Sequence, residues 1–441
     1  MSAESYFHEL AGTIDRALAS GERHATSFSA EETDFVRLNR GKVRQPGHVA
    51  QRYIEIQLIR GERHASHAMS LSGDVTTDAA AVAAAVTGLR SALPDLADDP
   101  HLLLPSTVTS TRVVRGGPLP SSEAIVETLL NGADGRDLVG LLAAGPVHRG
   151  FANSEGQRNW HSITTFNLQW SLYFRADKAV KASYSGLEWS GEALAARMQA
   201  SVEQLALIAR APKTLAPGKY RAYLAPAAME EMAELLSWGG FSARALQTQQ
   251  SALAKMRTGA RLDPRVQISE DIPSGVAPAF QAQGFVRPGN VPLITDGGLA
   301  GSLVSPRTAR EFGLDANAAN GAESPEALSM GGGTLAMHDA LAALDTGLAV
   351  GNLWYLNYSD RPAGRMTGMT RFATFWVQDG KVVAPVDVLR FDDTLYRMLG
   401  ANLESLTAER ELLLDSNTYG SRMLGSVTLP GALLSEMNFT L

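Results

Sequence analysis

The 441-residue sequence contains no cysteine. This absence excludes disulfide bonds, thiol nucleophiles and thiolate metal ligands. Histidine is also scarce, and none of the nine histidines lies between His161 and His338. The middle of the chain therefore offers none of the nitrogen or sulfur ligands from which most zinc sites are built.

Long apolar runs and blocks of one charge are absent as well. No run approaches the roughly 20 residues that a helix needs to cross a bilayer. The N-terminal residues carry acidic side chains where a signal peptide would carry basic ones. We therefore expect a cytoplasmic protein. The net charge of −7 is spread along the chain, which argues against nucleic acid or a membrane as a partner.

The length predicts more than one domain, because single cores stop growing at smaller sizes. Proline and glycine punctuate the segment from Ala211 to Lys219, where we place the boundary. The prediction is an α+β protein with an N-terminal α/β domain, residues 1–215, and a C-terminal β-rich, barrel-like domain, residues 216–441.

Periodicity indicates the elements of the first half. Apolar residues at helical spacing and at period two predict helices and strands, respectively. The expected helices are Phe7–Leu18, Val82–Leu93, Ile125–Leu130 and Leu194–Leu205, and the expected strands are Ile54–Leu58, Met69–Leu71 and Phe166–Phe174. Asn153 to Gly156 has the composition of a tight turn between strands.

The second half is richer in glycine and in short strand-like pieces that end at Asp-Gly turns. The expected strands include Val291–Thr295, Gly351–Leu356 and Phe375–Val377, with a helix at Leu395–Leu399. The glycines at 297–298 and 331–333 lack the Lys-Ser/Thr tail of a phosphate loop. We interpret them as turns with positive φ.

Several short motifs occur in a particular order. They are Phe151-Ala-Asn-Ser-Glu-Gly156, Pro217-Gly-Lys-Tyr220, Leu224-Ala-Pro226, the Gly284–Gly298 segment, Arg365-Met-Thr-Gly368 and Phe375-Trp-Val-x-x-Gly-Lys381. Together they resemble the TldD/PmbA metallopeptidase family, an older label of which is modulator of DNA gyrase. The resemblance implies a two-domain fold in a dimeric shell with a cavity at the subunit interface.

The same resemblance bears on metal binding. Zinc-bearing members carry His-Glu-x-x-x-His on a helix and a cysteine in the C-terminal domain. The helix that corresponds to it here follows a short strand and a proline turn, is expected to end at Gly239 and has no histidine. The chain therefore resembles the family's second kind of subunit, the TldE/PmbA type without metal. No catalytic residue, metal ligand or cofactor is assigned to this chain.

The motif helix still supplies candidate residues. Glu230 and Glu234 lie at i and i+4 on one face, with Glu231 beside them. Trp238 and Gly239 follow at the helix end, where a flat side chain can line a peptide channel. For the carboxylates we favour a solvated acidic face near a helix N-terminus. The other tryptophans are expected in the core.

The resulting functional hypothesis is a non-metal subunit of a zinc metallopeptidase complex that acts on peptides or unfolded segments. Zinc is expected in a TldD-like partner subunit of a heterodimer, and a homodimer is the other possible assembly. The alternative is a homodimeric peptide-binding protein without catalytic activity. A self-sufficient hydrolase is less favoured, because no Gly-x-Ser-x-Gly elbow occurs and only carboxylates and hydroxyls remain for catalysis.

Overall fold

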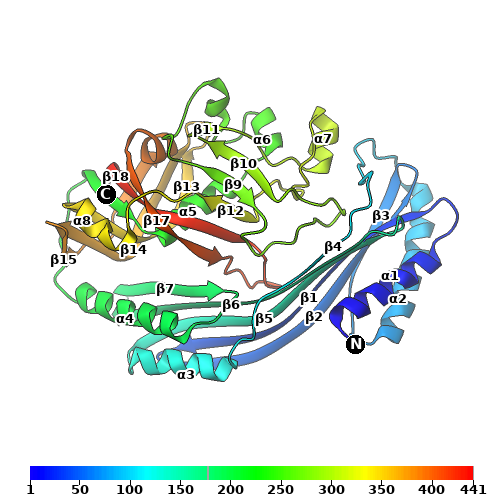
Figure 1. Cartoon of the computed structure of the whole chain (residues 1–441), viewed down its shortest axis with the longest axis horizontal. Coiled ribbons are helices and arrows are strands. Elements are labelled where there is room, and N and C mark those ends of the chain that lie inside the picture. Colours follow the sequence, from blue (N-terminus) through cyan, green and yellow to red (C-terminus); the bar gives the residue numbers. More distant parts are fainter. Residues whose placement is uncertain (176–177, 441) are drawn as a thin grey trace.

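Two separate β-sheets dominate the computed structural model, which describes residues 1–175 and 178–440 (Figure 1). The first sheet has seven strands and the second has eleven. Within the described residues no strand belongs to both sheets. The mixed α+β class is therefore as predicted. The last strand of the first sheet ends at Gly186, and the first strand of the second sheet begins at Gly218. A domain boundary at Ala211 to Lys219 stays a prediction.

The first sheet has the strand order β3-β2-β1-β5-β6-β4, and β7 also pairs with β6. Its strands are β1 (Arg23–Asn39), β2 (Lys42–Arg60), β3 (Arg63–Ser70), β4 (Thr111–Arg115), β5 (Asp137–Asn153), β6 (Arg158–Arg175) and β7 (Lys178–Gly186). The predicted alternation in β6 is confirmed for Phe166, Leu168, Trp170 and Leu172, which are all buried, but not for Phe174 at the end of the predicted run, which is 50% exposed. The predicted turn from Asn153 to Gly156 joins β5 to β6.

The helices of the first half cover the face of this sheet that points away from the second half (Figure 1). They are α1 (Ala3–Ala17), α2 (Val75–Ala92), the short η1 (Leu93–Asp95), α3 (Ser122–Ala133) and α4 (Gly191–Ile208). The four predicted helices are confirmed. Phe7 of α1 shows how they pack: its ring is fully buried and stacks on Phe28 of β1, with 5.1 Å between centroids.

The second sheet contains a closed ring of five strands, because β8 pairs with both β13 and β18, while β14 and β16 link those two on the other side. Its strands are β8 (Gly218–Leu224), β9 (Ile268–Asp271), β10 (Asn290–Thr295), β11 (Gly298–Leu299), β12 (Ala327–Met330), β13 (Gly347–Asp360), β14 (Arg365–Gln378), β15 (Lys381–Pro385), β16 (Arg390–Thr394), β17 (Leu403–Leu414) and β18 (Ser426–Phe439). The three strands predicted from Asp-Gly punctuation lie in β10, β13 and β14.

Short helices complete the second half. They are α5 (Pro226–Ser237), α6 (Ala243–Gln247), η2 (Ala254–Thr258), α7 (Pro306–Phe312), η3 (Met337–Asp339), α8 (Ala340–Leu344) and the π-helical η4 (Arg397–Ala401). The predicted helix at Leu395–Leu399 overlaps η4 and begins just before it. None of the described helices combines the length and the apolar character that crossing a membrane requires.

The two glycine-rich segments differ from one another. Gly297 has a positive φ of 68°, as predicted for a turn, and Asp296 before it has φ 48°. Gly298 has no positive φ and begins β11, so the prediction was wrong for it. The run at 331–333 has no positive φ either, so that interpretation was wrong there as well. Its glycines are needed for close approach instead, because a Cβ on Gly333 would lie 2.4 Å from the carbonyl oxygen of Leu406.

Candidate functional site

Helix α5 is the element that corresponds to the motif helix. Pro226 occupies its first turn, where no backbone N–H is needed, and strong helix formers follow. One face is buried in the core of the second half, with Met229, Met232 and Leu236 among its residues. Figure 1 shows α5 among the strands of the second half, where it packs mainly against β13 and β18.

The opposite face carries the predicted residues. Glu230, Glu234 and Trp238 follow one another at intervals of four, and Glu234 and Trp238 are exposed, Trp238 by 49%. The helix ends at Ser237, slightly earlier than predicted, with Trp238 as its C-cap. Gly239 has φ 85°, so its role is to turn the chain out of the helix.

Glu230 differs from the prediction of a freely solvated carboxylate. Its side chain is half-buried, and this burial raises its pKa to about 7. The charge of Lys181 on β7 lowers that pKa, whereas Glu231, Glu234 and Asp415 raise it. The solvated-face interpretation therefore holds for Glu234 and is wrong for Glu230 and Glu231, because burial raises the pKa of both of these carboxyls.

An aromatic cluster lies near these charges. The guanidinium of Arg371 on β14 lies 4.3 Å from the ring centroid of Trp354 and 5.5 Å from that of Phe372. Lys181 is 6.0 Å from the Phe372 ring. Tyr355 and Phe372 both have φ of 58°, which is unusual for bulky residues and typical of functional sites. Trp354 is 40% exposed, so the expectation of a core position was wrong for it.

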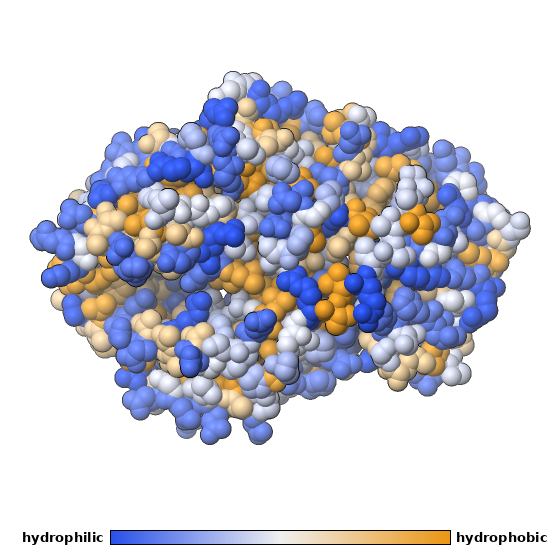
Figure 2. All heavy atoms as spheres, in the orientation of Figure 1, coloured by the Kyte–Doolittle hydropathy of each residue, from blue (hydrophilic) through white to orange (hydrophobic). Residues whose placement is uncertain are grey.

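Lys181 links the two groups of residues, because its charge acts on Glu230 and its Nζ lies near the Phe372 ring, at the boundary where β7 of the first sheet meets β14 of the second. Figure 2 shows this face of the molecule hollowed along that boundary, with apolar residues gathered beside it. A partly protonated carboxylate such as Glu230 donates or accepts hydrogen bonds near neutral pH. Cation–π partners and exposed rings suit contact with a peptide chain.

Zinc does not fit the donors of α5. Glu230 and Glu234 are carboxylates without a histidine or cysteine beside them. Across residues 1–175 and 178–440, no group of three or more histidine, aspartate or glutamate side chains is placed to hold a metal ion. The helix thus lacks the donor set that a tetrahedral zinc site requires.

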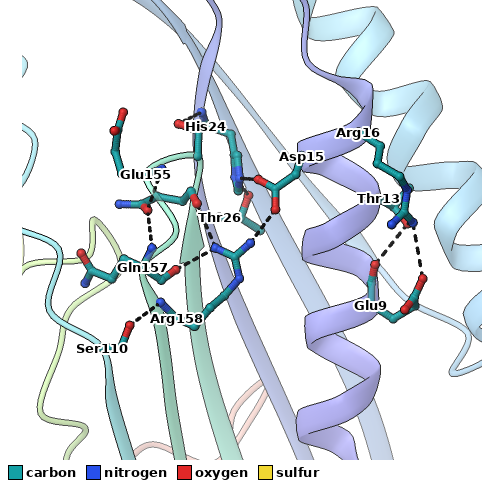
Figure 3. A network of polar contacts seen from close by, with 12 residues as sticks. Glu9, Thr13, Asp15, Arg16, His24, Thr26, Ser110, Glu155, Gln157 and Arg158 are labelled. Carbon is teal, nitrogen blue, oxygen red and sulfur yellow. Dashed lines mark hydrogen bonds and ion pairs between the residues drawn. The ribbon is translucent and has the colours of Figure 1, made fainter.

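A buried network near the N-terminus resembles a catalytic triad (Figure 3). Thr26 Oγ1 lies 2.8 Å from His24 Nδ1, and His24 Nε2 lies 2.9 Å from Asp15 Oδ1. The side chain of His24 and the whole of Thr26 are inaccessible to solvent, so no substrate can reach the hydroxyl. This network anchors α1 and gives no support to a self-sufficient hydrolase.

Sequence reasoning found the motif helix and missed the residues around it. Lys181, Asp415, Trp354 and Arg371 come from four different segments, and no spacing pattern connects them to Glu230. The positive φ values of Tyr355 and Phe372 have no sequence signal either, because such conformations are expected at glycine or asparagine.

Solved structures share this architecture over the whole chain. TldE from Thermococcus kodakarensis is 12% identical with a TM-score of 0.79, and the match covers 99% of this chain and 100% of that one. Proteins named as modulators of DNA gyrase are similar too: one from Thermotoga maritima MSB8 is 14% identical with a TM-score of 0.73, and one from Bacteroides thetaiotaomicron VPI-5482 is 15% identical with a TM-score of 0.75. Both of these matches cover 100% of each chain.

The chain thus has the two-sheet α+β fold of these proteins. It belongs to the PmbA/TldD family, because the family model for the PmbA/TldA metallopeptidase C-terminal domain matches residues 217–441, more than half of the sequence. No curated protein matches the chain.

Proposed function

We propose that this chain is the non-metal, TldE/PmbA-like subunit of a cytoplasmic zinc metallopeptidase complex that cleaves peptides or unfolded segments. The observation that carries the proposal is the face of α5, which presents Glu230, Glu234 and Trp238 but no histidine. In this proposal a TldD-like partner supplies zinc and the activated water. This chain completes the cavity and holds the substrate.

The experiment compares the chain alone, its nearest His-Glu-x-x-x-His paralogue alone, and a mixture of the two. Zinc content by elemental analysis and cleavage of an unfolded peptide are measured for each. We expect stoichiometric zinc only in the paralogue and the fastest cleavage in the mixture. Tightly held zinc in this chain after dialysis, or no effect of this chain on cleavage, would contradict the proposal.

A homodimeric peptide-binding protein is the second candidate. It is favoured by β3, which pairs with β2 on one side and has no strand on its other side within the described residues. An extended peptide can add to such an edge through backbone hydrogen bonds. A dimeric chain that binds peptide, and whose paralogue cleaves equally well without it, would favour this candidate.

A further inference from the structure

A cavity of about 470 Å³ lies between the first sheet and two loops of the second half. Its floor is the sheet face opposite to α1 and α2 and includes Ser27, Ser29 and Arg149. Its roof includes the loop between β9 and β10, which Figure 1 shows reaching toward the first sheet. The volume is in the range of about 300–1,000 Å³ that is typical of small-ligand sites.

Arg149 places a half-buried cation at this cavity. It lies on β5 directly opposite Ser29 of β1 and His161 of β6, so all three share one face of the sheet. Its Nη1 and Nη2 atoms donate to the backbone carbonyls of His148 at 2.9 Å and Arg422 at 3.3 Å. No ion pair with a described carboxylate involves it. Burial lowers its pKa, but a guanidinium stays charged at neutral pH.

A second arginine lies at the same cavity. The side chain of Arg287 is only 6% exposed and pairs with Glu326 through Nη2. Its Nε is buried without a hydrogen-bond partner. The charges of Glu31 and Glu326 favour the charged form of Arg149, but Glu326 is engaged by Arg287, and Glu31 already accepts side-chain and backbone hydrogen bonds. Glu55, the other carboxylate of the lining, is exposed, where water screens its charge.

The buried Nε of Arg287 needs an acceptor. Leaving a buried donor without a partner costs about 1–3 kcal/mol, and more for charged groups. Native structures therefore seldom keep such groups unless a ligand or water satisfies them. The hydroxyls of Ser27 and Ser29 also make no side-chain hydrogen bond within the described part of the chain, and both line the cavity.

We propose that this cavity binds a carboxylate group, with the planar guanidinium of Arg149 as its bidentate partner and Arg287 Nε and Ser29 Oγ as further donors. Arginine and carboxylate match geometrically and form strong, charge-assisted hydrogen bonds. The carboxylate is that of a peptide, either its C-terminus or an acidic side chain. The inference rests on the proposed function only in taking a peptide as the ligand.

The test uses the full chain without a partner subunit. Three peptides are titrated by isothermal titration calorimetry: N-acetyl-trialanine, its C-terminal amide, and N-acetyl-Ala-Glu-Ala amide. We expect the free acid to bind about tenfold or more tightly than its amide. Comparable binding of the glutamate peptide would identify a side chain as an accepted source, and weak binding would restrict the site to the C-terminus.

Variants of the chain test whether the peptide binds at Arg149. Arg149→Met should weaken binding of the free acid by about tenfold to a hundredfold, and Arg149→Lys by less, because the charge remains while the fork is lost. Arg115→Met is the matched control. Arg115 also donates to carbonyls across the two halves, those of Pro273 and Gly275, but does not line the cavity. The affinity of the Arg115→Met variant for the free acid should equal that of the wild type.

The proposal is overturned if acid and amide bind equally, if none of the peptides binds, or if the Arg149 variants bind like the wild type. Should Arg149→Met fail to fold in a thermal melt, Arg149→Lys and Ser29→Ala decide the question. Carboxylate binding by this chain, together with no effect on cleavage by the paralogue, would retain this inference and remove the proposed catalytic role.

Discussion

At the scale of single residues, the burial of Glu230 makes the stability of the protein depend on pH. Its pKa is raised from 4.5 to about 7 by burial. Between these two values the unfolded chain loses a proton that the folded chain keeps, so stability falls as pH rises. Below pH 4.5 Glu230 is protonated in both the folded and the unfolded chain, so the stability that is lost at higher pH is fully present.

We predict that Glu230→Gln, which removes this ionisation, becomes more stable relative to the wild type as pH rises. Between pH 5 and pH 8 its advantage in the free energy of unfolding should grow by about 2 kcal/mol. Urea denaturation at both pH values measures this. Glu127→Gln, an exposed position on α3, is the control and should follow the wild type. Parallel pH profiles for wild type and Glu230→Gln would show that Glu230 is not enclosed.

Gly284 lies at a close contact between the two halves. Its φ is 87°, its carbonyl accepts a hydrogen bond of 2.7 Å from Gln157 Nε2, and a Cβ there would lie 2.3 Å from the Phe151 ring. Gly156 has the same φ with no atom within 4 Å of its Cβ position. Substitutions at these two glycines therefore distinguish the cost of backbone strain from the cost of a steric clash.

We predict that Gly156→Ala costs about 1 kcal/mol, the price of backbone strain alone. Gly284→Ala should cost about 2–4 kcal/mol, because overpacking adds to the strain. Chemical denaturation of both variants measures the difference. Equal losses would mean that the loop after β9 moves freely away from Phe151.

At the scale of elements, α1 has two kinds of ion pair, one that joins it to the first sheet and one within the helix itself (Figure 3). Asp15 accepts hydrogen bonds from His24, whose side chain is fully buried, and from Arg158. Burial alone would raise the pKa of Asp15, but its contacts with His24 and Arg158 outweigh this and lower it. The pair between Glu9 and Arg16 on the outer face of α1 is exposed.

We predict that Asp15→Asn destabilises the docking of α1 by about 1–3 kcal/mol, because it leaves buried donors without a charged acceptor. Glu9→Gln should cost less than about 0.5 kcal/mol, as exposed pairs contribute little. Hydrogen exchange of the α1 amides measures both. If the two variants lose equal protection, the packing of Phe7 alone holds the helix.

Elements with a strong local period were predictable. The alternation of β6 and the apolar stripe of α1 are properties of consecutive residues, so the sequence alone indicates them. The partners of Glu230 were not predictable, because Lys181 and Asp415 reach it only through tertiary folding. The same holds for Arg149, which in sequence is simply an arginine within a strand.

At the scale of the whole molecule, the two halves interlock. Arg422, from the segment after β17, is buried and donates to the carbonyls of Gly145 at 3.0 Å and Thr165 at 3.2 Å. Burial lowers its pKa to about 10. Ala373 and Phe375 of β14 belong to the same apolar cluster as α3 and α4.

We predict that the chain unfolds in one cooperative transition, although it has two sheets. Separate unfolding would expose these shared apolar residues and leave Arg422 without its acceptors. Differential scanning calorimetry tests this. Two resolved transitions would instead support independently folding domains on either side of Ala211 to Lys219.

The ring of the second sheet also sets the order of events during synthesis. Gly218 at the start of β8 pairs with Phe439 at the end of β18, and every other ring strand lies between them in sequence. A ribosome must therefore release β18 before the ring can close. Until then β8 is a strand without one of its two neighbours, and nascent chains of this protein are expected to depend on chaperones.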